Sequence, residues 1–178
     1  MNNELIIDAG GTKYWYQDGQ FHRIGSPAVI HNDGSSCWYE NGRCHRLDGP
    51  AIEWANGDKE WWINGERHRI DGPAIECISG YQAWYVNDKI HRVNGPAIKY
   101  ADGCKFWYEY NIWHRLDGPA IEWSSGTKQW YENGKRHRLD GPAIEYANGY
   151  TQWWIKGKYI ECSTQEEFER LIKLGSFW

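Results

Sequence analysis

Residues 130–149 read WYENGKRHRLDGPAIEYANG, and this stretch predicts the fold because it contains two turn signals separated by short strands. Asn133-Gly134 is a strong signal for a two-residue hairpin loop of type I′, in which both central residues need a positive φ. Asn148-Gly149 is a second turn signal, and the runs between the turns are rich in Trp, Tyr and Ile, as strands are. The stretch therefore predicts antiparallel strands joined by tight turns.

The same pattern recurs along the chain with a period of 23 residues. The period is marked by His-Arg pairs, which begin at His22, His45, His68, His91, His114 and His137. A half unit precedes them, with Gly11, Trp15, Tyr16, Asp18 and Gly19 in register. Internal repeats of this length are typical of solenoid architectures. We expect one elongated, all-β domain of antiparallel β-hairpin repeats over residues 1–162.

Turn length decides which side chains share a face of the sheet, because successive residues of a strand point to opposite sides. If both turns of a repeat are two-residue loops, Trp62 pairs with Arg67, and Ile52 pairs with Trp61. This register predicts a core face with two rows of side chains: Trp15, Trp38, Trp61, Trp84, Trp107, Trp130 and Trp153, and Ile24, Leu47, Ile70, Val93, Leu116 and Leu139. It predicts that the opposite face is exposed to solvent; we call it the wet face, and it contains Ala51, Glu53, Trp62 and Arg69 and their equivalents in the other repeats.

Composition argues against several classes of protein. The formal net charge is −4, which provides no broad basic surface for a long nucleic acid. The opening residues, MNNELIIDAGG, contain neither a basic region nor a long apolar run, which argues against a signal peptide or a membrane span. The five cysteines are odd in number and scattered, which favours a reducing cytosol over a disulfide framework or a zinc site. We therefore expect a cytoplasmic protein.

The quoted stretch resembles the MORN repeat family, whose units are also 23 residues long and contain an aromatic-x-x-Gly-x-x-His core. Tyr131, Gly134 and His137 match that core. The chain departs from the family at Arg138, where MORN units usually have Gly, and in its Asp-Gly-Pro-Ala segment. It looks like a divergent subtype of the kind found in phage and large-DNA-virus proteins. The resemblance implies an elongated, curved sheet used for protein or lipid-head-group contacts, in the host cytoplasm if the source is viral.

A helix is predicted within residues 163–178. The segment Ser163-Thr164-Gln165-Glu166-Glu167 has the form of a capping box, and Gly175 is a stop signal. Phe168, Leu171 and Ile172 fall on one stripe of this helix. We expect the helix to cap the last repeat, because an open strand edge invites aggregation. The alternative is a helix that binds a partner.

The repeated His-Arg-x-Asp motif looks catalytic, but its repetition argues against an enzyme. An active site needs several different groups that meet once, whereas this motif recurs in almost every unit. Equivalent histidines in successive units are expected about 10 Å apart, because each unit adds two strands spaced by about 4.8 Å. They cannot share a metal ion, whose ligands lie about 2 Å away. We expect no catalytic residue, no metal site and no cofactor.

The Arg and aromatic rows of the predicted wet face support two interpretations. In one, they form cation–π and ion-pair ladders that stiffen the sheet. In the other, Arg binds phosphate while a ring stacks on a base. The third and fourth units depart most from the repeat, and hydrophobic residues at exposed hairpin tips mark contact surfaces. The candidate binding residues are Arg69, Arg92, Arg115, Tyr85, Tyr108, Phe106, Tyr110 and Trp113.

The leading expectation is a non-catalytic repeat protein that offers an extended binding surface to another macromolecule, as a scaffold, adaptor or inhibitor. A protein partner fits best. The alternative is a protein that sequesters a small phosphorylated nucleotide, with a role in viral counter-defence. A homo-oligomer formed through a strand edge near residues 1–10 stays open.

Overall fold

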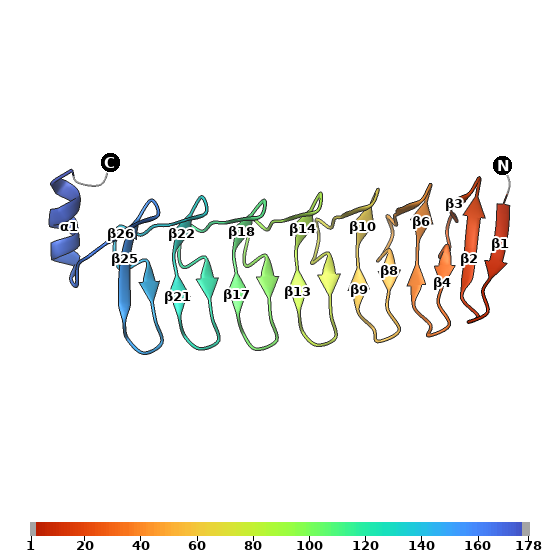
Figure 1. The fold of residues 1–178 in the computed structure, drawn as a ribbon, viewed down its shortest axis with the longest axis horizontal. Coiled ribbons are helices and arrows are strands. Elements are labelled where there is room, and N and C mark those ends of the chain that lie inside the picture. The colour runs from red at the N-terminus through yellow and green to blue at the C-terminus, as the bar shows by residue number, and fades with distance from the viewer. Residues whose placement is uncertain (1–2, 176–178) are drawn as a thin grey trace. The chain divides into compact units, whose positions relative to one another are not determined.

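A computed structural model describes residues 3–175 as antiparallel β-strands followed by one short helix (Figure 1). The expected all-β hairpin repeat with a C-terminal helix is confirmed. The chain forms two compact units, of which the first ends at Ile90 and the second begins at His91. The last three residues of the predicted tail, 176–178, lie outside the described residues.

The first unit is an antiparallel sheet to which each repeat adds two strands. Neighbouring strands follow the order β1 (Asn3–Ile7), β2 (Lys13–Gln17), β4 (Val29–Ile30), β5 (Ser36–Cys37), β8 (Ile52–Glu53), β9 (Lys59–Glu60), β12 (Ile75–Glu76) and β13 (Gln82–Ala83). Small hairpins accompany the sheet: β3 (Gln20–Phe21) pairs with β2, β6 (Tyr39–Glu40) with β7 (Arg43–Cys44), β10 (Trp62–Ile63) with β11 (Glu66–Arg67), and β14 (Tyr85–Val86) with β15 (Lys89–Ile90).

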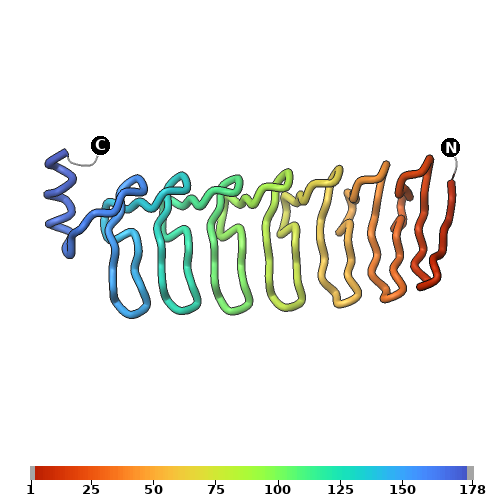
Figure 2. Tube along the Cα trace, viewed as in Figure 1, coloured from red at the N-terminus to blue at the C-terminus, as the bar shows by residue number. Residues whose placement is uncertain are grey.

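The second unit repeats this plan. Its strands follow the order β16 (Ile98–Lys99), β17 (Lys105–Phe106), β20 (Ile121–Glu122), β21 (Lys128–Gln129), β24 (Ile144–Glu145), β25 (Thr151–Ile155) and β26 (Lys158–Ile160). Its small hairpins pair β18 (Tyr108–Glu109) with β19 (Ile112–Trp113), and β22 (Tyr131–Glu132) with β23 (Lys135–Arg136). Figure 2 shows the loops of successive repeats side by side along this unit, from green to blue.

The small hairpins have the two-residue turns that the sequence predicts. Asn64 and Gly65 have φ values of 53° and 84°, as a type I′ turn requires. Trp62 pairs with Arg67 in the expected register. The amide of Gly65 donates to the carbonyl of Cys44 at 2.9 Å, so this small hairpin is bonded to the one before it.

The other turn of each repeat is a three-residue loop, and the predicted register there is wrong. The amide of Trp54 donates to the carbonyl of Asp58, and the amide of Gly57 donates to the carbonyl of Trp54, each at 2.9 Å. Ile52 consequently pairs with Glu60 instead of Trp61. A shift of one residue turns every side chain of the following strand to the opposite face.

The shifted register corrects the predicted faces. Trp61 lies on the same face as Arg69, whose guanidinium carbon is 3.9 Å from the ring centre. Glu60 lies on the face of Trp54 and Trp62, and its carboxylate accepts a hydrogen bond from each indole N–H, at 3.1 and 3.0 Å. The prediction of tryptophans inside and arginines outside is therefore wrong. Most of the tryptophan row is half-buried, with Trp84 and Trp153 buried.

The predicted aliphatic core row is also wrong, because its side chains are exposed. They occupy the bends that follow each His-Arg pair, and their exposed fractions run from 54% to 86%: Ile24, Leu47 and Ile70 in the first unit, and Val93, Leu116 and Leu139 in the second. The core instead contains an alanine row with 0% exposure, of which Ala51 was expected on the wet face: Ala28, Ala51 and Ala74, and Ala97, Ala120 and Ala143. Buried Ile98, Ile121 and Ile144 extend the core of the second unit.

Helix α1 (Gln165–Lys173) begins at the predicted capping box. The amide of Glu167 donates to Oγ1 of Thr164 at 3.2 Å, which caps the first turn. Phe168 is fully buried against Trp153, Ile155 and Ile160, so the helix covers the end strands β25 and β26. Among the described residues, no helix is long and apolar enough to cross a membrane.

Candidate functional site

The repeated arginine holds a bend in a fixed shape, as Arg46 illustrates. Its Nε donates to Asp48 at 2.8 Å, and its Nη1 donates to the carbonyl of Pro50 and to Glu53, each at 3.1 Å. The guanidinium also lies 4.2 Å from the ring centre of Trp38. We call this arrangement of Arg46, Asp48, Pro50, Glu53 and Trp38 the arginine clamp, and use the name for its equivalents.

Three further repeats contain the complete arginine clamp, centred on Arg69, Arg115 and Arg138. The glycine that follows each clamp aspartate gives the guanidinium room, since a Cβ at Gly72 would lie 2.7 Å from Cζ of Arg69. The hydrogen bond from Arg69 lowers the pKa of Asp71 below its ordinary value of 3.8. These contacts support the interpretation of the arginine row as a stiffening ladder.

Two repeats lack the clamp acids. In the first unit, Gly25 and Ile30 follow Arg23 at the positions that Asp48 and Glu53 occupy after Arg46. In the second unit, Asn94 and Lys99 stand at the same two positions after Arg92. Both arginines keep the bond from Nη1 to the proline carbonyl of the clamp, at 3.2 Å for Arg23 and 3.1 Å for Arg92. In these two repeats, the two acids that hold the arginine elsewhere are therefore replaced by other residues.

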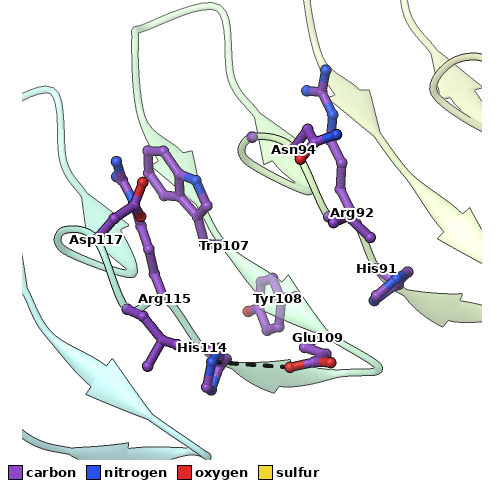
Figure 3. Close-up of a pocket in the computed structure, with 12 residues that line it drawn as sticks. His91, Arg92, Asn94, Trp107, Tyr108, Glu109, His114, Arg115 and Asp117 are labelled. Atoms are coloured by element: carbon purple, nitrogen blue, oxygen red, sulfur yellow. Dashed lines mark hydrogen bonds and ion pairs between the residues drawn. The ribbon is translucent and has the colours of Figure 1, made fainter.

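A groove of about 540 Å³ lies between the bends of Arg92 and Arg115 in the second unit (Figure 3). Trp107, Tyr108, Glu109 and Asp117 are among the residues that line it. The structure thus brings together three of the predicted site residues, Arg92, Arg115 and Tyr108. The guanidinium of Arg115 lies 4.0 Å from the centre of the Trp107 ring, so one face of that ring is already covered.

The remaining candidates of the second unit have different surroundings. Tyr110 is at the hairpin tip as predicted, 49% exposed, and its ring stacks on His91 with centroids 4.0 Å apart. Trp113 is half-buried and packs against Tyr108 and Tyr131, with ring centroids 5.8 and 5.0 Å away, so its expected place at an exposed tip is corrected. Phe106 is buried in β17 and is unsuited to contact a ligand.

Arg69 and Tyr85 belong to the first unit. Arg69 is the centre of a complete clamp, and its polar groups are bonded within the fold. Tyr85 belongs to the hairpin β14–β15, where the guanidinium of Arg67 lies 5.3 Å from its ring and 4.7 Å from that of Trp62. Their contacts favour a structural role for both residues.

The histidines support the hairpins. Nδ1 of His45 accepts a hydrogen bond from the amide of Asn64, the first turn residue of the next hairpin, at 3.0 Å. Equivalent bonds to the next turn are made by His22, His68, His114 and His137. Within residues 3–175, no group of three His, Cys, Asp or Glu side chains could hold a metal ion.

The five cysteines are free thiols. Burial raises the pKa of Cys37 to about 11 and that of Cys44 to about 12, so both are protonated at neutral pH. A thiol attacks as its thiolate, and these side chains therefore behave as small hydrophobic residues of the core.

The exposed aliphatic residues are the surface feature that sequence reasoning missed. Leu47 and Asp48 share the rim of a smaller groove of about 210 Å³, which Trp38 and Arg46 also line. Val93 and Leu116 line the larger groove of the second unit. We call the six exposed aliphatic residues of the bends the aliphatic row. The signal for them was the Pro that follows each bend, because such a segment is too irregular to bury its side chains in a sheet.

Comparison of the chain with protein-family models gives no match, and comparison with curated proteins gives none either. The resemblance to MORN repeats therefore stays a prediction. Function must be argued from the site itself.

Proposed function

We propose that the chain is a non-catalytic repeat protein whose bends form an extended binding surface for a protein partner. One observation carries this proposal: the aliphatic row is exposed at the same place in every repeat, with Leu47 and Ile70 at 78% and 86%. Exposed hydrophobic side chains that recur in a row mark interaction surfaces, whereas single ones need no explanation.

The surroundings of the aliphatic row favour a protein over other macromolecules. Four of the six bends present an aliphatic side chain beside an Arg–Asp pair, as Leu47 does beside Arg46 and Asp48. A partner would gain from burying the aliphatic group and from bonding the free lone pairs of the aspartate. A long nucleic acid is disfavoured, because these exposed aspartates repel phosphates and the net charge is −4.

The mechanism is binding to a rigid surface. The clamps fix the bends, and the alanine row fixes the sheet beneath them, so a partner pays little ordering entropy on this side of the interface. Repetition within a unit lets several weak contacts add along one partner, which is how repeat proteins reach useful affinity.

Peptide display tests this proposal. We expect that peptides selected on the purified chain bind about tenfold or more weakly to a variant with Leu47→Asp and Ile70→Asp, as measured by biolayer interferometry. The matched control is Ile78→Asp, because Ile78 is 73% exposed but lies outside the aliphatic row. A failure to select any peptide, or peptides that bind both variants equally, contradicts the proposal.

The nucleotide alternative has weaker support. The groove of about 540 Å³ has a suitable size, and it contains Arg92 with Tyr108. However, Arg115 is bonded to Asp117 and Glu122, and Glu109 adds a negative charge at the rim. A thermal-shift screen with mono-, di- and cyclic nucleotides tests this alternative, since bound ligand raises the melting temperature by mass action. No shift at millimolar nucleotide would exclude it.

A further inference from the structure

Arg23 of the first unit is an arginine clamp without its carboxylates. Its guanidinium lies 4.0 Å from the centre of the Trp15 ring, and its Nη1 donates to the carbonyl of Pro27 at 3.2 Å. These are two of the contacts that hold Arg46 over Trp38. The arginine is therefore oriented by the fold, although the acids that complete the clamp elsewhere are missing.

The bend itself explains why no internal acid replaces them. Gly25 occupies the position of Asp48 and has a φ of 72°, so the backbone takes a different path there. Ile30 occupies the position of Glu53. Among the described residues, no carboxylate lies within ion-pair distance of Arg23, and its Nε makes no hydrogen bond. The guanidinium thus presents donors that four other repeats use to bind a carboxylate.

We propose that Arg23 binds a carboxylate of a partner peptide, in the way that Arg46 binds Asp48. The inference deepens the proposed function and rests on it, because it names the chemistry of the partner at one bend. The complete clamps define the geometry, since Nε of Arg46, Arg69, Arg115 and Arg138 meets its aspartate at 2.8 to 2.9 Å. Stacking on Trp15 orients the guanidinium in advance, which reduces the entropy lost on binding.

The neighbours of Arg23 favour a single carboxylate over a phosphate. Arg23 lines two grooves, of about 440 and 210 Å³, and Glu4 contributes to the first and Glu40 to the second. A phosphate carries more negative charge and would meet stronger repulsion from these side chains. Leu5 and Ile24 are exposed beside Arg23, at 51% and 78%. The side chain that fits is therefore an Asp or Glu with an aliphatic neighbour in the partner sequence.

Arginine side-chain NMR tests the inference directly. The Nε–H signals of the ¹⁵N-labelled chain are followed during titration with sodium acetate. Separate control titrations use sodium chloride and methyl phosphate at matched ionic strength. We expect a saturable shift of the Arg23 signal with acetate, with a dissociation constant on the order of tens of millimolar, as one charge-assisted pair with an exposed group allows. The Arg46 signal should not respond, because its Nε is bonded to Asp48.

A matched variant makes the result decisive. Asp48→Ala removes the internal partner of Arg46 and should give that signal an acetate response like that of Arg23. If Arg23 stays silent while Arg46 of this variant responds, the inference is wrong. It is equally wrong if neither signal responds, or if chloride or methyl phosphate shifts Arg23 as much as acetate does.

A separate comparison distinguishes this inference from the proposed function. Peptides selected on the chain are tested against Arg23→Gln and against the variant with Leu47→Asp and Ile70→Asp. Loss of binding only in the second variant supports the aliphatic surface and contradicts carboxylate recognition by Arg23. Loss in both variants, with acidic residues enriched in the peptides, supports the two together. An acetate response without selected peptides leaves Arg23 as an anion site and contradicts the proposed function.

Discussion

The guanidinium carbon of Arg69 lies 3.9 Å from the centre of the Trp61 ring, so the arginine and the tryptophan that recur in every repeat share one face of the sheet. This pairing follows from the loop at residues 55–57, which has three residues instead of two and turns the next strand over. The aliphatic row lies outside these strands, in the bends that follow each His-Arg pair, and is exposed there. The core of the protein and its candidate binding surface are therefore set by different segments of the repeat.

The arginine clamp should contribute to stability. Arg69→Ala removes bonds to Asp71, Glu76 and the carbonyl of Pro73, together with the contact to Trp61. We expect the free energy of unfolding to fall by about 1–3 kcal/mol, measured by urea denaturation. Lys59→Ala is the control, because Lys59 is exposed in the neighbouring strand, and it should change stability by less than about 0.5 kcal/mol. Equal effects of the two changes would show that the clamp has no energetic role.

The clamp aspartates predict a loss of stability in acid. The hydrogen bond from arginine lowers the pKa of Asp48, Asp71, Asp117 and Asp140 in the folded chain below 3.8. An aspartate whose pKa is lower in the folded chain stabilises the fold at pH values above its pKa in the unfolded chain. This contribution is lost as the pH falls through its pKa in the folded chain. We expect the melting temperature to fall below about pH 3.8, and to fall less steeply when all four are changed to Asn. A parallel acid profile for wild type and variant would contradict this account.

The alanine row should not tolerate larger side chains. Ala74 is fully buried, and its carbonyl accepts the amide of Trp61 at 2.8 Å. Ala74→Leu is therefore expected to cost about 1–3 kcal/mol of unfolding free energy by overpacking, seen as a lower midpoint in denaturant. Ala55 is exposed in the three-residue loop, and Ala55→Leu serves as the control with little effect. If Ala74→Leu is neutral, the core is looser than the structure indicates.

Helix α1 is expected to protect the end of the sheet. Phe168→Ala leaves a cavity beside Trp153 and Ile160 and should cost about 3–5 kcal/mol locally. Hydrogen exchange of the amides of β25 and β26 should accelerate in this variant, and the exposed edge should promote aggregation. Leu174→Ala is the control, because Leu174 is 69% exposed. Unchanged hydrogen exchange of the amides of β25 and β26 would favour the alternative, in which the helix binds a partner.

Local signals explain how much of the fold could be predicted. The period and the type I′ hairpins follow from Asn-Gly pairs such as Asn64-Gly65, since few residues adopt positive φ. Asn56-Gly57 has the same letters, but it ends a three-residue loop, because Trp54 and Asp58 close that loop through their backbones. The sequence does not distinguish these loop lengths, and the error placed Trp61 on the wrong face.

The candidate site was predicted only in part, for the same reason. Arg92, Arg115 and Tyr108 do line one groove, because equivalent positions of successive repeats lie side by side. Trp113 was misplaced, since packing against Tyr108 and Tyr131 is a tertiary contact that no local pattern reveals. The departures at Gly25 and Ile30 were visible in the sequence, but their meaning depends on the contacts of Arg46, which only the structure supplies.

The most direct test of the account is the solvent accessibility of methyl groups, measured by NMR with a soluble gadolinium complex. The account predicts strong relaxation enhancement for Leu47, Ile70 and Leu116 at the bends, and weak enhancement for Ile121 and Ile144 in the core. The opposite pattern, with protected bend residues and accessible strand isoleucines, would contradict the proposed binding surface.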